Sequence, residues 1–153
     1  DPVAVRSLVK DDRRFVYFVN REYYPVAVTV AFNQAPGNVI NAATGESEPG
    51  LSPWMVVLSP YELRAIIVAP EIALTGFEAR PPAEIASVLE QRAREALADI
   101  ESVRLSGVLV PGMDEMEEGI SRAMEEKRYA WLRRALDGYI VRKCRALAAD
   151  RSE

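Results

Sequence analysis

The sequence predicts an α+β protein in which an antiparallel β-sandwich-like domain of six to seven short strands precedes two or three amphipathic helices. Short runs of β-branched and aromatic residues alternate with turn residues up to about residue 80, and Ala, Glu, Arg and Leu recur at helical spacing afterwards. Strands followed by helices, rather than alternating with them, favour α+β over a parallel βαβ sheet. We therefore expect two domains, a β domain at 1–80 and a helical hairpin or three-helix unit at 81–153.

The first three strands have the clearest patterns. Residues 3–9 and 15–20 are rich in Val and Phe, and the polar turn KDDRR separates them. In PVAVTVAF, Val alternates with Ala and Thr, the period-2 pattern of a strand with one buried face, and we expect the face that carries Val26 to be buried. The connection NREYYP is short, so we expect the second and third strands to be antiparallel neighbours.

The remaining strands are separated by turns that contain Gly and Pro. Pro36 and Gly37 precede the short strand NVINA, and Gly45 can adopt a positive φ in the turn TGE. The runs WMVVL and YELRAIIVA are expected to complete a meander. IALTGFEA is expected to pair at an edge or to lead toward the helices.

The helical half begins at Pro81 and Pro82, and Glu84 complements the helix dipole in the first turn. The segment SGVLVPG interrupts the helical pattern, and acidic residues then mark the start of another helix. After residue 112 the pattern fits one long helix or two, and we expect two with a bend near Lys127. The amphipathic stripes lie at residues 85–103, 113–124 and 132–147.

Composition excludes several classes of function. A net charge of −4 gives little support to nucleic-acid binding, which depends on a basic surface. The longest apolar runs are far shorter than the roughly 20 residues needed to cross a bilayer. Because there is no His and the only Cys is Cys144, zinc, haem and thiol-redox sites lack their usual ligands, and we expect no metal and no cofactor. Cys144 is interpreted as a small apolar helix residue, with a nucleophile as the alternative.

Paired carboxylates are the catalytic option that this composition leaves, because sugar hydrolysis needs two acids that flank one bond. The candidates near strands are Glu62, Glu71 and Glu78, and the alternation at Glu62 and Leu63 directs Glu62 away from a core. No calcium loop and no phosphate-binding glycine pattern occurs. We therefore predict no catalytic residues in this chain and no enzymatic activity of its own.

Three aromatic residues are candidates for carbohydrate binding. Tyr23, Tyr24 and Trp54 fall at predicted loops or strand starts, where an exposed ring could stack on a sugar face while its polar edge stays hydrated. The alternative is that these rings pack over the rim of the core or at a domain interface.

Part of the β domain resembles a known family. An Asn-Arg pair (Asn20 and Arg21) precedes the valine-rich strand, a TGE turn follows at 44–46, and Leu58 with Pro60 and Tyr61 leads into the last long strand. This pattern, over residues 14–69, resembles the antiparallel β-domain that follows the catalytic barrel in many glycoside hydrolases, although Ala42 and Ala43 stand where an acidic residue is common. The resemblance implies a noncatalytic domain, because the barrel carries the chemistry in these enzymes, and an extracytoplasmic or secreted location.

The functional hypothesis is a noncatalytic accessory domain of a larger carbohydrate-active, glycoside-hydrolase-like protein. We expect it to pack against a neighbouring domain of the parent chain or the helices, through the aromatics and the exposed side of AIIV. The first alternative is a carbohydrate-binding module that holds a polysaccharide. The second is an assembly module that forms a homo-oligomer through the helices. Its contact residues would be Met113, Met116, Met124 and the Leu132 stripe.

The sequence leaves the setting of the chain open. It begins with Asp1 rather than Met, so we expect it to be processed or cut from a longer protein. Apart from what the resemblance implies, the localisation, the parent's substrate and the oligomeric state follow from no feature of the residues.

Overall fold

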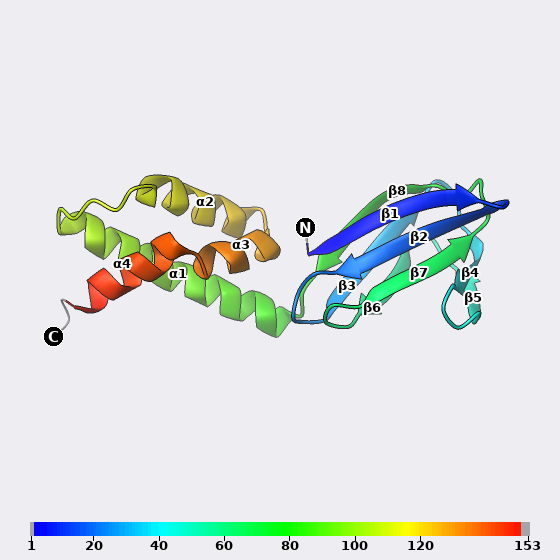
Figure 1. Ribbon diagram of the computed structural model, residues 1–153, viewed down its shortest axis with the longest axis horizontal. Coiled ribbons are helices and arrows are strands. Elements are labelled where there is room, and N and C mark those ends of the chain that lie inside the picture. Colours follow the sequence, from blue (N-terminus) through cyan, green and yellow to red (C-terminus); the bar gives the residue numbers. More distant parts are fainter. Residues whose placement is uncertain (1, 151–153) are drawn as a thin grey trace. The chain divides into compact units, whose positions relative to one another are not determined.

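The computed structural model describes residues 2–150, and the chain divides into two compact units between Pro82 and Ala83 (Figure 1). Over the described residues, the first unit contains eight antiparallel strands in two sheets and the second contains four helices. The predicted α+β class, with an N-terminal β region and C-terminal helices, is confirmed. Both kinds of element are more numerous than expected, because Ser47–Gly50 forms a strand and the residues after 112 are broken twice.

The strands of the first unit form one five-stranded and one three-stranded sheet, and every pairing is antiparallel. The five-stranded sheet has the order β1 (Val3–Lys10), β2 (Arg13–Asn20), β7 (Leu63–Val68), β4 (Gly37–Asn41) and β5 (Ser47–Gly50). The three-stranded sheet has the order β6 (Trp54–Leu58), β3 (Val26–Phe32) and β8 (Leu74–Arg80).

The expected pairing of the second and third strands is wrong. β2 pairs with β1 and β7 in the larger sheet, whereas β3 pairs with β6 and β8 in the smaller one. The expected meander is wrong for the same reason, because β6 and β7 also lie in different sheets. The connections at 21–25 and 59–62 each carry the chain from one sheet to the other. Alternation along a strand shows that one face is buried, but it does not show which strand lies beside it.

The core of the β unit lies between the inner faces of the two sheets. Val26, Val28, Val30 and Phe32 are buried, which confirms the predicted inner face of β3. Phe18 of the larger sheet and Trp54 of the smaller one meet with their ring centroids 5.8 Å apart. Inward residues from both sheets therefore share one core, as in a β-sandwich.

The helices of the second unit are α1 (Ala83–Leu105), α2 (Met113–Glu125), α3 (Tyr129–Leu136) and α4 (Tyr139–Ala149). The predicted break after α1 is confirmed, and Gly107 and Gly112 adopt positive φ within it. The predicted bend near Lys127 is also confirmed, because Lys127 has a φ of 53° between α2 and α3. A further break at Asp137 and Gly138 separates α3 from α4, so the region holds three helices rather than the expected two.

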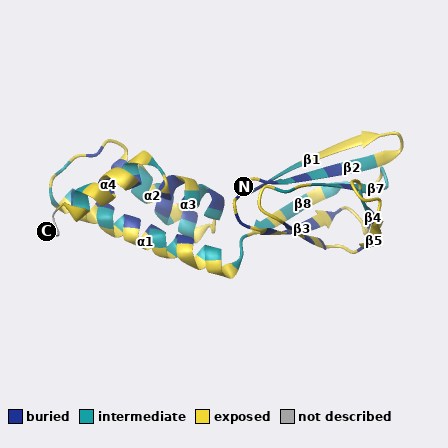
Figure 2. Cartoon of the chain, turned by 60° about the horizontal axis from the view of Figure 1, so that its bottom comes forward, coloured by how far each residue is buried: buried dark blue, intermediate teal, exposed yellow. Residues whose placement is uncertain are grey.

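The helical unit has its own apolar core. Figure 2 shows buried and exposed stretches alternating along α1, as an amphipathic helix requires. Val88, at the edge of the predicted stripe of α1, is exposed instead. The core residues include Leu89, Ala93, Ala96, Ile100 and Val103 of α1 together with Ile120, Leu132, Leu136, Val141 and Cys144 of the other helices.

A close contact between α2 and α3 generates the first prediction. A Cβ atom added at Gly119 would lie 2.6 Å from Cη2 of the Trp131 indole, well inside van der Waals contact. Gly119→Ala would otherwise gain about 1 kcal/mol of helix propensity. Because the indole must move, we expect the change to destabilise the protein by about 1–3 kcal/mol, measured by urea unfolding followed by circular dichroism.

The control for this prediction is Trp131→Leu, which removes the indole. In that background Gly119→Ala should be neutral or stabilising, so the two changes should be strongly coupled in a double-mutant cycle. A stabilising effect of Gly119→Ala in the wild-type background would contradict the contact.

Candidate functional site

The three aromatic candidates lie in different environments. Tyr23 is 50% exposed, whereas Tyr24 is 2% and Trp54 is 5% exposed, so the expectation of exposed rings is wrong for Tyr24 and Trp54. Tyr23 and Tyr24 contact each other edge to face with centroids 5.1 Å apart, but Trp54 pairs with Val30 farther along β3. The indole N–H of Trp54 donates to Glu48 at 2.7 Å. Trp54 therefore packs between the sheets, and the three rings do not form one platform.

Two of the connections between the sheets, at 21–25 and 59–62, meet at the buried side chain of Asn20. Its Nδ2 donates to the carbonyl oxygens of Tyr24 at 2.8 Å and Ser59 at 2.9 Å, and its Oδ1 accepts from the N–H of Glu22 at 3.0 Å. The backbone N–H of Asn20 donates to the carbonyl oxygen of Glu62 at 2.9 Å. Asn20 therefore joins the connection after β2 to the connection before β7.

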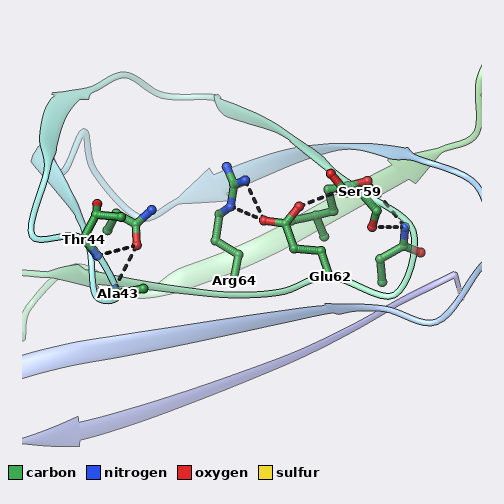
Figure 3. Close-up of polar contacts among 8 residues, drawn as sticks. Ala43, Thr44, Ser59, Glu62 and Arg64 are labelled. Atoms are coloured by element: carbon green, nitrogen blue, oxygen red, sulfur yellow. Dashed lines mark hydrogen bonds and ion pairs between the residues drawn. The ribbon is translucent and has the colours of Figure 1, made fainter.

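Glu62 lies in the second of these connections (Figure 3). One carboxylate oxygen accepts from the backbone N–H of Ser59 at 2.7 Å, and the other accepts from Nε of Arg64 at 2.7 Å. Burial raises the pKa of Glu62, but the Ser59 N–H and the Arg64 guanidinium together lower it by more than burial raises it. The pKa of Glu62 therefore lies below its ordinary value. At neutral pH this carboxylate holds the turn as an anion.

The candidate carboxylates do not converge. Glu62 precedes β7 and Glu71 follows it, so these two lie at opposite ends of one strand. Glu78, on β8 of the other sheet, forms an exposed ion pair with Arg80 at 2.6 Å. A glycosidase pair requires carboxyl groups within roughly 5–10 Å of each other across one bond. The positions of these three residues therefore do not provide that geometry.

The turn at 44–46, which contributes to the resemblance, closes the hairpin of β4 and β5. Oδ1 of Asn41 accepts from the N–H groups of Ala43 and Thr44 at 2.9 and 3.4 Å, which Figure 3 draws beside the two labelled residues. The Thr44 hydroxyl donates to the Glu46 carboxylate at 3.0 Å. Gly45 has a φ of 75°, as the sequence predicts for this turn. These hydrogen bonds lie within the turn, so its polar residues stabilise the turn itself.

The solvent side of the five-stranded sheet carries a run of apolar side chains, with Arg6 beside Tyr17, where a solvated antiparallel sheet would usually be polar. Leu8 of β1 is 53% exposed and Leu63 of β7 is 63% exposed. The other apolar side chains on this side, from β2, β4 and β7, are half-buried. Strand register aligns Leu8, Phe15, Ile67 and Ile40 in one row, and Val19 with Leu63 in another. We call this surface the outer face. It consists of Leu8, Phe15, Tyr17, Val19, Ile40, Leu63, Ala65 and Ile67.

The outer face is partly anticipated by the sequence. Ala65 and Ile67 form the exposed side of AIIV, but the aromatic residues beside them are Phe15 and Tyr17 rather than the three candidates. The rings of Phe15 and Tyr17 stack with centroids 6.4 Å apart and an interplanar angle of 17°. In the sequence, Phe15 and Tyr17 alternate with Val16 and Phe18, which are buried, and this alternation could have identified the outer aromatic pair. That alternation marks both sides of β2 as apolar.

The residues proposed for assembly through the helices lie in the core of the helical unit. Met113 and Leu132 are buried, and Met116 and Met124 are half-buried against the same cluster. They are therefore used within the unit. Apolar side chains on its surface are instead Val88, Leu105, Leu109 and Tyr139.

Charged groups in the helical unit mainly connect its helices. Arg104 of α1 binds Glu101 at 2.7 Å, Asp114 at 2.9 Å, and Glu117 of α2. Hydrogen bonds to Glu117, Asp114 and Glu101 raise the pKa of Arg104 above its ordinary value. This cluster bridges the loop between α1 and α2.

Two further titratable groups of the helical unit are shifted by burial. Burial, followed by a hydrogen bond to Glu90 at 2.7 Å, raises the pKa of Tyr129 to about 12. Burial and the Asp99 carboxylate raise the pKa of the Cys144 thiol. Cys144 is buried in the core of the helical unit, which fits the apolar interpretation, whereas a nucleophilic thiol would need a lowered pKa.

Over residues 2–150, no group of three or more Asp, Glu or Cys side chains is arranged to hold a metal ion. Among the helices in the same range, none is long and apolar enough to cross a membrane.

Asn20 generates a prediction about stability. In Asn20→Asp an oxygen replaces the Nδ2 donor and faces the carbonyl oxygens of Tyr24 and Ser59. A buried charge without a donor is costly, so we expect a loss of about 3 kcal/mol in the free energy of unfolding. Asn33 is the matched control, because its exposed carboxamide bridges Glu71 and Ala73 in a similar way. Asn33→Asp should cost less than about 1 kcal/mol, and an equal cost would contradict the role of Asn20.

Glu62 generates a prediction about pH. Its pKa is lower in the folded protein than the ordinary value of 4.5, so ionised Glu62 stabilises the fold above that value and the contribution is lost as the pH falls through the folded pKa. Glu62→Gln should therefore be destabilising by about 1 kcal/mol at neutral pH and nearly neutral at acidic pH. Urea unfolding of both proteins across this range measures the difference. If the loss of unfolding free energy caused by Glu62→Gln became larger as the pH falls, the lowered pKa assigned to Glu62 would be contradicted.

Comparison with known proteins adds a partial likeness to a solved structure. No protein-family profile matches the chain, and no curated protein matches it. The chain is similar to part of a proposed alpha-galactosidase from Bacteroides fragilis, whose crystal structure aligns with a TM-score of 0.40 and 21% identity. The alignment covers 45% of this chain and 16% of that one, so the chain spans a small part of the length of the protein it matches.

Proposed function

We propose that this chain is a noncatalytic accessory part of a larger carbohydrate-active protein, in which the β unit packs against a neighbouring domain through its outer face. The observation that carries the proposal is the row of apolar side chains on the solvent side of β2 and β7. Contiguous apolar surface of this kind marks interaction sites in proteins that are otherwise soluble.

The composition of the outer face favours a protein partner over solvent. Phe15 and Tyr17 supply large rings at low conformational cost, and Leu63 and Ile67 surround them with aliphatic surface. These residues stand on paired strands rather than loops, so their positions are set before a partner arrives. A flat, preorganised apolar surface is typical of a permanent contact between domains.

The carbohydrate-active setting is supported by the sequence resemblance over residues 14–69. Its residues occupy structural positions: Asn20 joins two of the connections between sheets, and Thr44 to Glu46 close a hairpin. None of them is needed for chemistry in this role. A domain that acts as a spacer or a brace requires such rigid turns and no catalytic pair.

The experiment compares this chain alone with the full-length polypeptide by hydroxyl-radical labelling and mass spectrometry. We expect Leu8, Leu63 and Tyr17 to be labelled severalfold more slowly in the full-length polypeptide. Met55 and Val57, which are equally apolar and exposed on the other sheet, should be labelled at the same rate in both.

Matched variants test the same surface by substitution. Leu63→Lys should loosen the contact between the domains, seen as faster proteolysis between them, whereas Met55→Lys should not. Both side chains are mostly exposed in the β unit, so neither change should unfold it. A full-length polypeptide without a further domain, or equal labelling of the outer face in both samples, would contradict the proposal.

A further inference from the structure

A groove opens at one end of the five-stranded sheet, where β4 separates from β7. β4 pairs with β7 at Ile40 and Asn41, whereas its first residues, Gly37 and Asn38, pair with β5 on the opposite side. The separation leaves a space of about 720 Å³ between the start of β4 and the end of β7. This volume lies within the range of small-molecule sites.

The groove combines a polar rim with an apolar floor. It is lined by Asp12 of the turn between β1 and β2, by Arg13 at the start of β2, and by Asn38 and Asn41 of β4, residues with carboxylate, guanidinium and carboxamide side chains. Ile67, together with Ile40 and Val68, lines the apolar part. Opposite charges balance, so the groove as a whole is close to neutral.

The backbone around the groove leaves room for a ligand. Gly37 and Gly45 both have positive φ, and an added Cβ atom at either position would meet nothing within 4 Å. Asn41 uses Oδ1 to hold the turn at Ala43. Polar groups are thus held at the rim while space remains beside them.

The chemistry of the lining favours one class of ligand. A phosphate or other anion would call for net positive charge, and a divalent cation would call for several anionic oxygens, but the groove offers one charge of each sign. Carboxylate, guanidinium and carboxamide groups bind hydroxyl groups in pairs, and an aliphatic floor suits the C–H face of a sugar ring. A neutral polyhydroxylated ligand satisfies both.

We infer that the groove between β4, β7 and the β1–β2 turn is a binding site for a neutral oligosaccharide. It differs from the aromatic site expected at Tyr23, Tyr24 and Trp54, because amide and charged side chains provide the recognition. The inference goes beyond the proposed docking function and rests on different polar groups, since Asp12 and Asn38 are not part of the outer face; Ile40 and Ile67 belong to both surfaces.

The test is titration of the ¹⁵N-labelled chain with cellohexaose, xylohexaose, mannohexaose and maltohexaose, observed by two-dimensional NMR. We expect at least one of these probes to shift the amide signals of Gly37, Asn38 and Gly45 with a dissociation constant on the order of 1 mM. Asn38→Ala should weaken that binding about tenfold, because one hydrogen-bonding side chain is lost.

The turn provides a matched pair of variants. Asp11 and Asp12 both have positive φ, near 50°, but only Asp12 is among the residues that line the groove in the described part of the chain. Asn tolerates this conformation, so Asp11→Asn and Asp12→Asn should both preserve the turn. Asp12→Asn should weaken binding severalfold, and Asp11→Asn should leave it unchanged.

Three results would overturn the inference. The first is the absence of shifts with all four hexasaccharides, and the second is equal weakening by Asp11→Asn and Asp12→Asn. The third is tighter binding of an anionic probe, oligogalacturonate, that is lost when salt is raised about tenfold, which would mark an anion site centred on Arg13 instead.

Discussion

The β unit depends on the side chain of Asn20, which joins two of the connections that carry the chain between the sheets. Without this side chain the buried carbonyl oxygen of Tyr24 and the partly buried one of Ser59 would lose a donor, and an unsatisfied buried group carries a penalty on the order of 1–3 kcal/mol. The carboxamide supplies donors to Tyr24 and Ser59 and an acceptor to Glu22. With these bonds made, β2 and β7 can lie in one sheet while β3 and β6 lie in the other.

This arrangement determines which surfaces are available for function. Because β2 and β7 are neighbours, their alternating residues place Phe15, Tyr17, Leu63 and Ile67 on one side and Phe18 and Ile66 on the other. The inner set meets the smaller sheet, with Trp54 filling the space against Phe18. No second sheet packs against the outer set within the described β unit, and this is the physical basis for the proposed docking. The groove arises at the same sheet's end, where β4 leaves β7.

The helical unit is stabilised in a different way, through close packing of small and large residues. Gly119 allows the Trp131 indole to approach α2, and Ala93 and Ala96 are buried on α1. Arg104 bridges α1 and α2 through three carboxylates, and Tyr129 of α3 donates to Glu90 of α1. Methionines that could have served association between protomers fill this core instead. Each unit thus has an apolar core of its own.

The order of strands before helices, the inner face of β3, and the breaks near Gly107 and Lys127 follow from the amino-acid pattern, because they depend on residues close together in the chain. This pattern also identified Gly45 as a turn residue and the exposed side of AIIV. Long-range contacts were needed to show that β2 and β3 belong to different sheets, that Trp54 is buried, and that Phe15 and Tyr17 share a surface with Ile67. Alternation shows that a residue faces one side of a strand, but the partner on that side comes from distant segments, which the local pattern does not encode.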